Sequence, residues 1–271
     1  MDTIYVENLT RDYGEKKGVF QLSFSVGQGE SFGFLGPNGA GKTTVIRHLM
    51  GFLKPQRGTC QIKQLDCWSK REQVQKHVGY VPGEISFFED MTGMEFLKFV
   101  EQYRGNAAEN HKRELLERFE LNPKTKIKKM SKGTKQKLAI TAAFMHNPHV
   151  IILDEPTSGL DPLMQNRFIE LLNEEKQHGK TIFLSSHMFE EVERTCDRIG
   201  MIRNGKLVVV DTVEALRRHL RSYTVNLSTE QAAKDFAKDF GGTQQGQSVT
   251  VSPKLSLEEI FMNYYGGNKN D

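Results

Sequence analysis

The chain has 271 residues and a formal net charge of +3, with 37% hydrophobic and 26% charged residues. These values are typical of a soluble, globular protein with one large α/β domain and a small appendage. The weak positive charge argues against a nucleic-acid-binding protein. The three cysteines are too few and too scattered for a disulfide framework, and they lack the spacing of zinc ligands.

Neither a membrane span nor a signal peptide is expected. No uninterrupted apolar run approaches the roughly 18 residues that a membrane-spanning helix needs. The first residues have the pattern of a strand and not that of a signal peptide. We therefore expect a protein that stays in the cytosol unless a partner holds it elsewhere.

The amino-terminal part has strand-type patterns on both sides of a polar turn. Apolar residues predict strands at residues 4–6 and 20–26, and residues 10–18 between them form a polar turn that contains Tyr13. Residues 30–35 (ESFGFL) predict a third strand. This strand leads directly into a glycine-rich loop.

The glycine-rich loop has the pattern G-x-x-x-x-G-K-[ST] and precedes an expected helix. Its residues are Gly36, Pro37, Asn38, Gly39, Ala40, Gly41, Lys42 and Thr43, and Thr44 begins the helix. Glycines let the backbone curl, so that amide N–H groups and the positive end of the helix face an anion. Lys42 is expected to reach the terminal phosphates and the Thr43 hydroxyl to bind Mg²⁺. The pattern predicts a phosphate-binding P-loop, with a structural glycine turn as the alternative.

The rest of the chain alternates strands and helices up to about residue 221. Strands are expected at residues 59–65, 77–81, 150–153 and 181–184. Helical segments are expected at residues 92–119, between Ser131 and Pro148, at 163–176, and after the strand at 181–184 up to Glu193. Asn204-Gly205 is expected to form a hairpin turn. The composition changes near Ser222, after which strands at 223–227 and 249–251 are expected around a helix at 231–240. We interpret residues 222–271 as a small accessory region, with a loosely packed tail as the alternative.

Two acids end the apolar strand at residues 150–153, and a histidine follows the next apolar strand. A carboxylate at the tip of such a strand lies beside a P-loop, so Asp154 is the candidate ligand of Mg²⁺. Glu155 is expected to point the other way from the pleat and to polarise a water in line with the γ-phosphate. The alternative is that both acids only cap the next segment. His187 can donate to the γ-phosphate and help to orient the water.

Together these motifs resemble the nucleotide-binding domain of ABC transporters over roughly residues 1–220. They correspond to the Walker A motif at residues 36–43, the Walker B motif at 150–156 and the D-loop at 158–161. Their order and spacing agree with the family, which makes the match highly specific.

The resemblance implies an α/β fold with a P-loop NTPase core and a mixed sheet. An antiparallel β subdomain and a helical signature subdomain at about residues 85–148 would complete the nucleotide-binding domain, at residues 1–221. The small C-terminal accessory region would occupy residues 222–271.

The resemblance also assigns roles to single residues. Tyr13 matches the aromatic residue that stacks on adenine, with a plain turn aromatic as the alternative, and His187 matches the switch histidine. Asp161 matches the acid of the D-loop. Ser131 and Gly133 match the signature motif, which in the family meets the ATP bound by the opposite subunit. Each ATP would therefore be sandwiched between two chains.

The sequence departs from the family at two motifs. Within residues 130–137, Lys132 and Thr134 stand where L-S-G-G-Q has a glycine and a glutamine. Lys132 is expected either to add a charge near the phosphate or to point to water. Gly83 stands where the Q-loop usually has a glutamine, and it has no side chain that can reach Mg²⁺. Glu84 is the candidate substitute.

Two further stretches have alternative interpretations. Residues 124–137 hold seven lysines, which either form a solvated face or attract nucleotide or anionic lipid. Residues 85–100 are rich in Phe and Met. By family analogy Phe87, Phe88 and Met91 are candidates for contact with a transmembrane subunit, with a plain helical-subdomain core as the alternative.

The resemblance implies an ATP-binding and ATP-hydrolysing motor subunit of an ABC membrane transporter, with ATP and Mg²⁺ as cofactors. Its partners would be a second ATP-binding subunit, identical or homologous, and a transmembrane permease that holds it at the cytoplasmic face of the membrane. No nucleic acid is expected. The tail and the altered signature look most like the bacterial export-type (ABC-2) branch. The alternatives are a soluble ABC ATPase that remodels a protein or nucleoprotein assembly, and a non-hydrolysing regulatory subunit.

Overall fold

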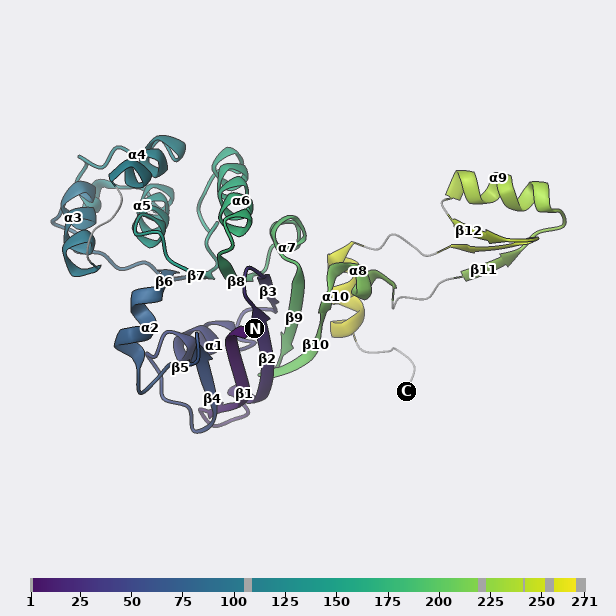
Figure 1. The fold of residues 1–271 in the computed structure, drawn as a ribbon, viewed down its shortest axis with the longest axis horizontal. Coiled ribbons are helices and arrows are strands. Elements are labelled where there is room, and N and C mark those ends of the chain that lie inside the picture. The colour runs from purple at the N-terminus through teal and green to yellow at the C-terminus, as the bar shows by residue number, and fades with distance from the viewer. Residues whose placement is uncertain (1, 105–108, 219–222, 241, 252–255, 267–271) are drawn as a thin grey trace. The chain divides into compact units, whose positions relative to one another are not determined.

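The computed structural model describes residues 2–104, 109–218, 223–240, 242–251 and 256–266 (Figure 1). The chain divides into two compact units, residues 1–210 and 211–271. The predicted boundary between residues 221 and 222 lies outside the described residues. None of the helices within the described ranges has the length and apolar character needed to span a bilayer.

The larger unit begins with an antiparallel sheet of strand order β2-β1-β4-β5, as predicted for the β subdomain. Its strands are β1 (Asp2–Asp12), β2 (Gly18–Gly27), β4 (Arg57–Ile62) and β5 (Leu65–Asp66). β1 runs past the predicted end because Arg11 and Asp12 still pair with Val19 and Gly18 of β2. The polar turn predicted at residues 10–18 is therefore shorter than expected.

A mixed sheet of strand order β10-β9-β3-β8-β7-β6 forms the centre of this unit. Its strands are β3 (Ser31–Leu35), β6 (Val78–Val81), β7 (Val150–Asp154), β8 (Thr181–Ser186), β9 (Arg198–Arg203) and β10 (Lys206–Thr212). All except β10 pair in parallel and are largely buried, as expected for strands covered on both faces. Asn204 and Gly205 form the predicted hairpin turn, and both have positive φ (48° and 72°), as a type I′ turn requires.

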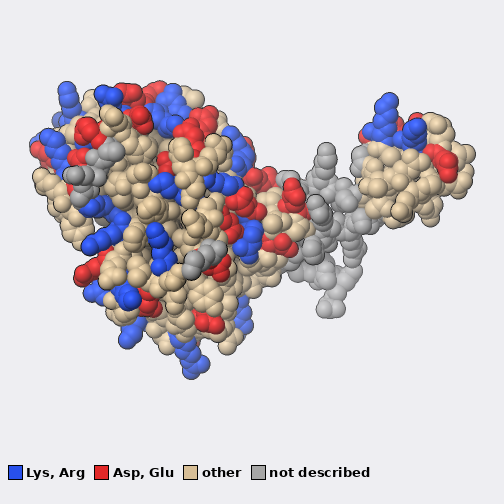
Figure 2. All heavy atoms as spheres, in the orientation of Figure 1, with Lys and Arg blue, Asp and Glu red and all other residues tan. Residues whose placement is uncertain are grey.

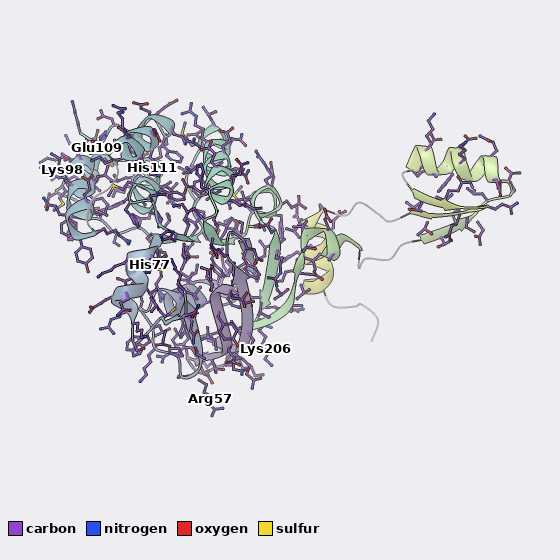
Figure 3. All side chains as sticks on the ribbon, in the orientation of Figure 1. Arg57, His77, Lys98, Glu109, His111 and Lys206 are labelled. Carbon is purple, nitrogen blue, oxygen red and sulfur yellow. The ribbon has the colours of Figure 1, made fainter. Side chains whose placement is uncertain are left out.

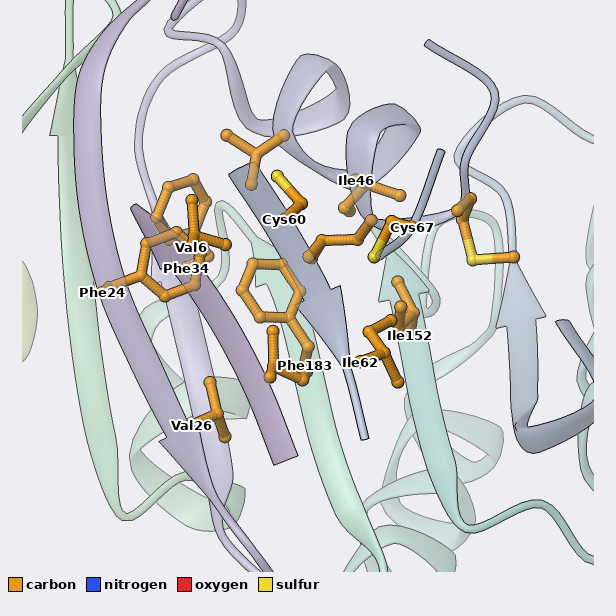
Figure 4. Packing of buried hydrophobic residues seen from close by; sticks show 14 of the residues in the cluster. Val6, Phe24, Val26, Phe34, Ile46, Cys60, Ile62, Cys67, Ile152 and Phe183 are labelled. Carbon is orange, nitrogen blue, oxygen red and sulfur yellow. The ribbon is translucent and has the colours of Figure 1, made fainter. Parts of the chain in front are cut away.

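The alternation of side chains along β3 sets the packing on the two faces of the mixed sheet. One face carries a cluster of aromatic rings with centroids 5.4 to 5.9 Å apart, from Phe24, Phe32, Phe34 and Phe183. Figure 4 labels three of them, Phe24, Phe34 and Phe183. Gly33 faces the other way, toward α7 (Phe189–Thr195). A Cβ atom at Gly33 would lie only 2.4 Å from Cγ1 of Val192, so α7 can approach the sheet this closely only over a glycine.

The other helices next to the sheets are α1 (Lys42–Leu49), α2 (Arg71–His77) and α6 (Pro162–Gln177). α2 was not predicted, because a seven-residue helix whose buried residue is Val74 has no clear helical period in the sequence. His77 is the last residue of this helix (Figure 3), so the strand predicted at residues 77–81 begins one residue later, at Val78.

The helical subdomain consists of α3 (Gly93–Arg104), α4 (Glu109–Arg118), the 3₁₀ turn η1 (Ile127–Lys129) and α5 (Lys132–Phe144). The helical region predicted at residues 92–119 is therefore divided into two helices. Thr92 and Glu95 start α3 with a capping box: the Glu95 carboxylate accepts from the Thr92 backbone N–H at 2.7 Å, and the Thr92 hydroxyl accepts from the Glu95 N–H at 3.2 Å.

The smaller unit contains an antiparallel sheet of strand order β11-β13-β12 with α9 packed against it. Its elements are α8 (Val213–Arg218), β11 (Tyr223–Asn226), α9 (Glu230–Phe240), β12 (Gly242–Gln245), β13 (Ser248–Val251) and α10 (Leu257–Gly266). β12 was not predicted because its sequence, GTQQ, lacks apolar alternation. Ala233 and Val249 are fully buried, so this unit has a small packed core.

Arg104, at the end of α3, ties the helical subdomain to the mixed sheet. Its Nη1 lies 3.0 Å from the carbonyl oxygen of Gln75, 2.8 Å from that of Val78 and 3.0 Å from Nε2 of His146. Because a guanidinium group only donates, Nε2 of His146 must be unprotonated to accept. Burial, together with the Arg104 charge, lowers the pKa of His146 to about 4. Protonation of His146 therefore opposes this contact.

We expect the larger unit to lose stability as the pH falls from 6.5 toward about 4 through His146. In this range an unfolded histidine binds a proton and the folded one does not, so acid favours unfolding. Between about pH 7.5 and about pH 5, the wild type should lose about 2 kcal/mol more unfolding free energy than the His146→Gln variant. Urea titrations followed by the fluorescence of Trp68, the single tryptophan, measure this difference. The same pH dependence in both proteins would contradict the prediction.

Candidate functional site

The glycine-rich loop follows β3 at the carboxyl edge of the mixed sheet and leads into α1. Gly39 and Gly41 have positive φ (80° and 115°), a conformation that favours glycine. A Cβ atom at Gly36 would lie 2.6 Å from the carbonyl oxygen of Ile202, and one at Gly41 would lie 2.8 Å from Cγ1 of Val19. Backbone conformation and close packing therefore both require glycine here.

Lys42 is held inside the curled loop. The residue is 6% exposed, and its Nζ donates to the carbonyl oxygens of Gly36 at 2.6 Å and of Pro37 at 3.3 Å. The same nitrogen lies 3.4 Å from Oε1 of Glu155, an atom that is buried and has no hydrogen-bond partner. A largely desolvated cation at the start of a helix favours a bound anion.

β7 and β8 end side by side and bring together the predicted acids and histidine. Asp154 is 2% exposed, and its Oδ1 accepts a hydrogen bond from Oγ of Ser185 at 2.5 Å. Glu155 follows with a positive φ of 49°, and its Oε2 lies 2.5 Å from Nδ1 of His187. The structure thus places the Glu155 carboxylate between Lys42 and His187.

The loop borders a hollow of about 420 Å³, called here the P-loop hollow. Its wall includes Pro37, Asn38, Gly39, Gly41, Lys42, Thr43, Thr44 and Glu155, together with Tyr13, Lys17 and Gly18 from the turn between β1 and β2. Gly36 and Ala40, which were also predicted to bind nucleotide, are buried and do not belong to the wall. The hollow unites the predicted Walker A residues with Tyr13 and Glu155.

Tyr13 presents a half-exposed ring at this hollow. The residue is 51% exposed, and the guanidinium carbon of Arg11 lies 5.3 Å from its ring centroid. Its backbone N–H donates to the carbonyl oxygen of Lys17 at 2.9 Å, so the short turn brings both residues to the same wall. Lys17 was not predicted as a site residue; the signal available was a basic residue in the turn that contains Tyr13.

A larger hollow, of about 590 Å³, lies at the opposite edge of the mixed sheet. Its wall includes His149 and Lys180, which immediately precede β7 and β8. The predicted P-loop, Walker B and signature residues are not part of this wall. Volume alone therefore does not identify the site, whereas the residues at the P-loop hollow do.

The signature region forms the start of α5. Oγ of Ser131 accepts from the backbone N–H of Thr134 at 3.1 Å and caps the helix as predicted. Nζ of Lys132 donates to Oγ of Ser158 at 3.0 Å. A Cβ atom at Gly159 would lie 3.1 Å from Cγ of Lys132, so the stem of the lysine runs along this glycine. Lys132 therefore binds the D-loop stretch of its own chain, which neither expectation for it had included.

Two further contacts fasten the first turns of α5 to the same stretch. A Cβ atom at Gly133 would lie 2.6 Å from the carbonyl oxygen of Gly159, so the two backbones approach closely. Gln136 is 2% exposed, and its Nε2 donates to the carbonyl oxygen of Pro156 at 2.6 Å. Residues 156–160, called here the D-segment, are therefore packed against the signature helix.

Asp161 directly follows the D-segment and starts α6. Its Oδ1 accepts from the backbone N–H of Met164 at 3.0 Å, and Pro162 occupies the first turn of the helix. In the single chain, the carboxylate of Asp161 thus has a capping role. Its role toward a partner chain stays a prediction.

Gly83, at the position of the missing Q-loop glutamine, lies against the end of β7. A Cβ atom there would lie 3.3 Å from Oδ2 of Asp154. The backbone therefore keeps its place beside the acid although the side chain is missing. Glu84 is exposed, and its substitution for the glutamine stays a prediction.

The predicted metal ligands offer oxygen donors. Ser185 donates a hydrogen bond to Oδ1 of Asp154 and not to Oδ2, and Thr43 lies in the wall of the P-loop hollow. Carboxylate and hydroxyl oxygens, completed by substrate phosphates and water, are the ligands that suit Mg²⁺. Within the described part of the chain, no three His, Cys, Asp or Glu residues are grouped so that they could hold a metal. A metal ion at this edge would therefore depend on the phosphates for further ligands.

The lysine-rich residues 124–137 are partly neutralised by acids. Lys128 lies 3.0 Å from Asp90, and Lys135 lies 3.2 Å from Glu89. Figure 2 shows basic and acidic side chains interspersed on the visible face of the larger unit. These observations favour the solvated-face interpretation of this stretch.

The Phe- and Met-rich stretch is only partly buried. Phe87 packs edge-on against Phe96 at a centroid distance of 4.8 Å, and Phe88 packs against Phe99 at 5.6 Å. Phe87 is half-buried, whereas Phe88 is 56% exposed. Phe87 therefore agrees with the core interpretation, and Phe88 remains available for contact with a partner.

Known proteins resemble this chain in both sequence and fold. The family profile described as ABC transporter matches residues 19–158. The linearmycin resistance ATP-binding protein LnrL of Bacillus subtilis (strain 168) is 36% identical and covers 82% of this chain and 73% of its own length. The bacitracin transport ATP-binding protein BcrA of Bacillus licheniformis is 37% identical and covers 81% of this chain and 73% of its own length.

A solved structure described as the ATP-binding subunit of an ABC transporter has a TM-score of 0.75 to this chain. It is 32% identical and covers 80% of this chain and 92% of its own. The family profile spans more than half of the chain and includes the P-loop, the signature region and both acids. The chain therefore belongs to the ABC transporter ATP-binding proteins and is an ATPase of that family.

Proposed function

We propose that this chain is the motor subunit of an ABC transporter and works in a dimer, with a second copy or a homologue, that sandwiches two ATP molecules. The observation that supports this is the convergence of Lys42, Glu155 and His187 beside the P-loop hollow. A carboxylate in contact with a cation on one side and an imidazole on the other supplies the groups that phosphoryl transfer to water needs. Closure of the dimer would move separate transmembrane subunits, and hydrolysis would reopen it.

The roles of the residues follow from their contacts. The loop amides and Lys42 hold the phosphates, and Tyr13 stacks on the adenine. The Glu155 carboxylate, which contacts Lys42 through Oε1 and His187 through Oε2, accepts the proton of the attacking water. His187 orients this water and donates to the γ-phosphate. Catalysis is thus positioning combined with charge stabilisation.

Thr43 and Asp154 would hold Mg²⁺, which when bound neutralises charge on the phosphate oxygens. Ser131 and Gly133 would complete the ATP site of the partner chain, where the amides at the start of α5 can face the phosphates. The capped and fastened start of α5 supports this role, because it holds those amides in a fixed orientation.

We propose that the transporter is an exporter and that a permease holds this subunit at the cytoplasmic face of the membrane. The names of the linearmycin resistance and bacitracin transport relatives support this assignment. So does the Nod factor export ATP-binding protein I of Sinorhizobium fredii (strain NBRC 101917 / NGR234), which is 32% identical and covers 95% of this chain and 73% of its own length. Phe87, Phe88 and Met91 are the proposed permease contact.

Co-purification from the native membrane tests the permease assignment. A polytopic membrane protein should accompany the chain, and its presence should change the rate of ATP hydrolysis. The variant Phe88→Asp should weaken this association, while Tyr5→Asp, at an exposed tyrosine of β1, should not. Purification without a membrane protein but with a soluble assembly would favour a remodelling ATPase instead.

Glu155→Gln should stop turnover while ATP still binds. The amide cannot accept the proton of the attacking water, and loss of a general base lowers the rate by about 100-fold or more. Phosphate release measures turnover, and size-exclusion chromatography with ATP should show the dimer accumulating. Glu175→Gln, at a buried glutamate of α6, serves as the control. Hydrolysis at the wild-type rate in Glu155→Gln would refute the proposed base.

Lys42→Ala should weaken ATP binding by about 10- to 100-fold, because a charge-assisted hydrogen bond to phosphate is lost. Fluorescent-nucleotide titration measures the affinity. Lys112→Ala is the matched control, since Lys112 is also buried but pairs with Glu101 in the helical subdomain. Equal affinities of Lys42→Ala and the wild type would count against the phosphate cradle.

Lys132→Met should lower ATP turnover about two- to fivefold through the D-segment, as expected for one exposed hydrogen bond. Ser158→Ala should have the same effect, and the double variant should show no further loss. Lys132→Arg, which keeps a donor, should retain activity. A direct contact of Lys132 with phosphate would instead make the two effects additive and would raise KM for ATP.

A further inference from the structure

Glu191 is a buried carboxyl group beside the site that the proposed reaction does not use. It lies in α7 and is 2% exposed. Its Oε2 accepts a hydrogen bond from Oγ of Ser186 at 2.6 Å, and its Oε1 is buried without a partner. Burial raises the pKa of Glu191 to about 7, and the charge of Glu155 contributes. A carboxyl group at such a position is costly, so its contact with Ser186 needs a reason.

Ser186 passes this contact on to the peptide that carries His187. Its hydroxyl donates to Glu191 and also accepts from the backbone N–H of Met188 at 2.9 Å. The residues before and after His187 are therefore joined through one hydroxyl group. Because Glu191 fixes the position of that hydroxyl, it also fixes the turn between β8 and α7.

His187 depends on such a support because packing does little to hold its ring. The side chain is 62% exposed. Its Nδ1 lies 2.5 Å from Oε2 of Glu155, and its backbone N–H points to the same oxygen at 3.4 Å. Both contacts require the peptide of residues 186–188 to stay beside Glu155.

Thr157 of the D-segment closes the same cluster from the other side. Its Oγ1 lies 3.6 Å from Sδ of Met188, and Thr157 lines a small cavity together with Met188 and Glu191. The segment that carries His187 and the segment that follows Glu155 therefore meet beside Glu191.

We propose that Glu191 is a positioning residue for His187. Its carboxyl group holds Ser186, and it thereby keeps the His187 imidazole against Glu155. It acts through Ser186 and does not touch the nucleotide. The inference rests on the role in hydrolysis proposed for His187.

The test uses phosphate release by the full chain over a range of Mg-ATP concentrations. Glu191→Met removes the acceptor and keeps the size of the side chain, and an adjoining cavity of about 130 Å³ leaves room for the sulfur. Its kcat should fall about tenfold while KM for ATP stays within about twofold, since His187 acts on the chemical step. Ser186→Ala should give the same fall, and the double variant no further loss.

Glu191→Gln provides the rescue, because glutamine has the shape of a protonated carboxyl group and still accepts from Ser186. It should keep most of the wild-type kcat. Glu175→Met is the matched control for replacing a buried carboxyl group, since Glu175 is 4% exposed and lies outside the P-loop hollow. This variant should leave kcat unchanged. Thermal unfolding establishes that each variant is folded.

Three outcomes would overturn the inference, and His187→Ala tells the first two apart. If His187→Ala loses activity but Glu191→Met keeps the wild-type kcat, Glu191 does not position the histidine. If His187→Ala itself hydrolyses ATP at the wild-type rate, the proposed role of His187 is wrong, and the inference falls with it. An equal fall of kcat in Glu175→Met would attribute the effect to general packing.

Discussion

The parallel pairing of β8 with β3 on one side and β7 on the other is the constraint on which the site depends. In this register Leu35 lies opposite Ser186, and Asp154 lies opposite Ser185. The carboxyl ends of three strands therefore meet at one edge, where ligands of open α/β sheets bind. Since side chains alternate along a strand, a slip of β8 by one residue would turn Ser185 away from Asp154 and Ser186 away from Glu191. The register thus positions the loop, the acids and the histidine together.

The packing on the two faces of the sheet stabilises this register and extends to the site. On one face the stacked rings of β2, β3 and β8 exclude water from the strands. On the other, Gly33 lets α7 approach β3 so closely that a Cβ atom would clash with Val192. Val192 follows Glu191 in α7. The small residue in β3 therefore brings the carboxyl group of Glu191 within reach of Ser186.

The features that were predictable from the sequence are those whose chemistry depends on local spacing. The P-loop and the two acids are of this kind, because a strand, a turn and a helix start are contiguous in the chain. The direction of Glu155 was predicted from the strand pleat, but β7 ends at Asp154 and the positive φ of 49° turns the side chain. Strain of this kind at a functional site is not visible in a pattern of residue types.

The contacts of Lys132, Lys17 and Glu191 were beyond sequence reasoning for a different reason. Those of Lys132 and Lys17 depend on segments that only the fold brings together: Lys132 and Ser158 are 26 residues apart, and the turn that carries Lys17 meets the P-loop across two sheets. Residue type did not indicate that Glu191 is buried, because a glutamate near the start of a helix usually faces solvent and is stabilised there by the helix dipole.

The D-segment connects the groups that would serve two different ATP molecules in the proposed dimer. On one side it is held by α5 through Gln136 and Lys132, and on the other Thr157 contacts Met188, which follows His187. The start of α5 would serve the partner's ATP, whereas Glu155 would serve the chain's own. Energetic coupling between sites needs such a contiguous network with more than one arrangement.

The contacts of the D-segment differ in how easily they can change. The buried amide of Gln136 cannot leave Pro156 without an unsatisfied polar group, which costs about 1–3 kcal/mol. The exposed bond from Lys132 to Ser158 can be exchanged for water at about 0.5–1.5 kcal/mol or less. A rearrangement on dimer closure would therefore begin at Lys132. The lysine that replaces the glycine of the usual signature thus lies at the part of the network that is free to move.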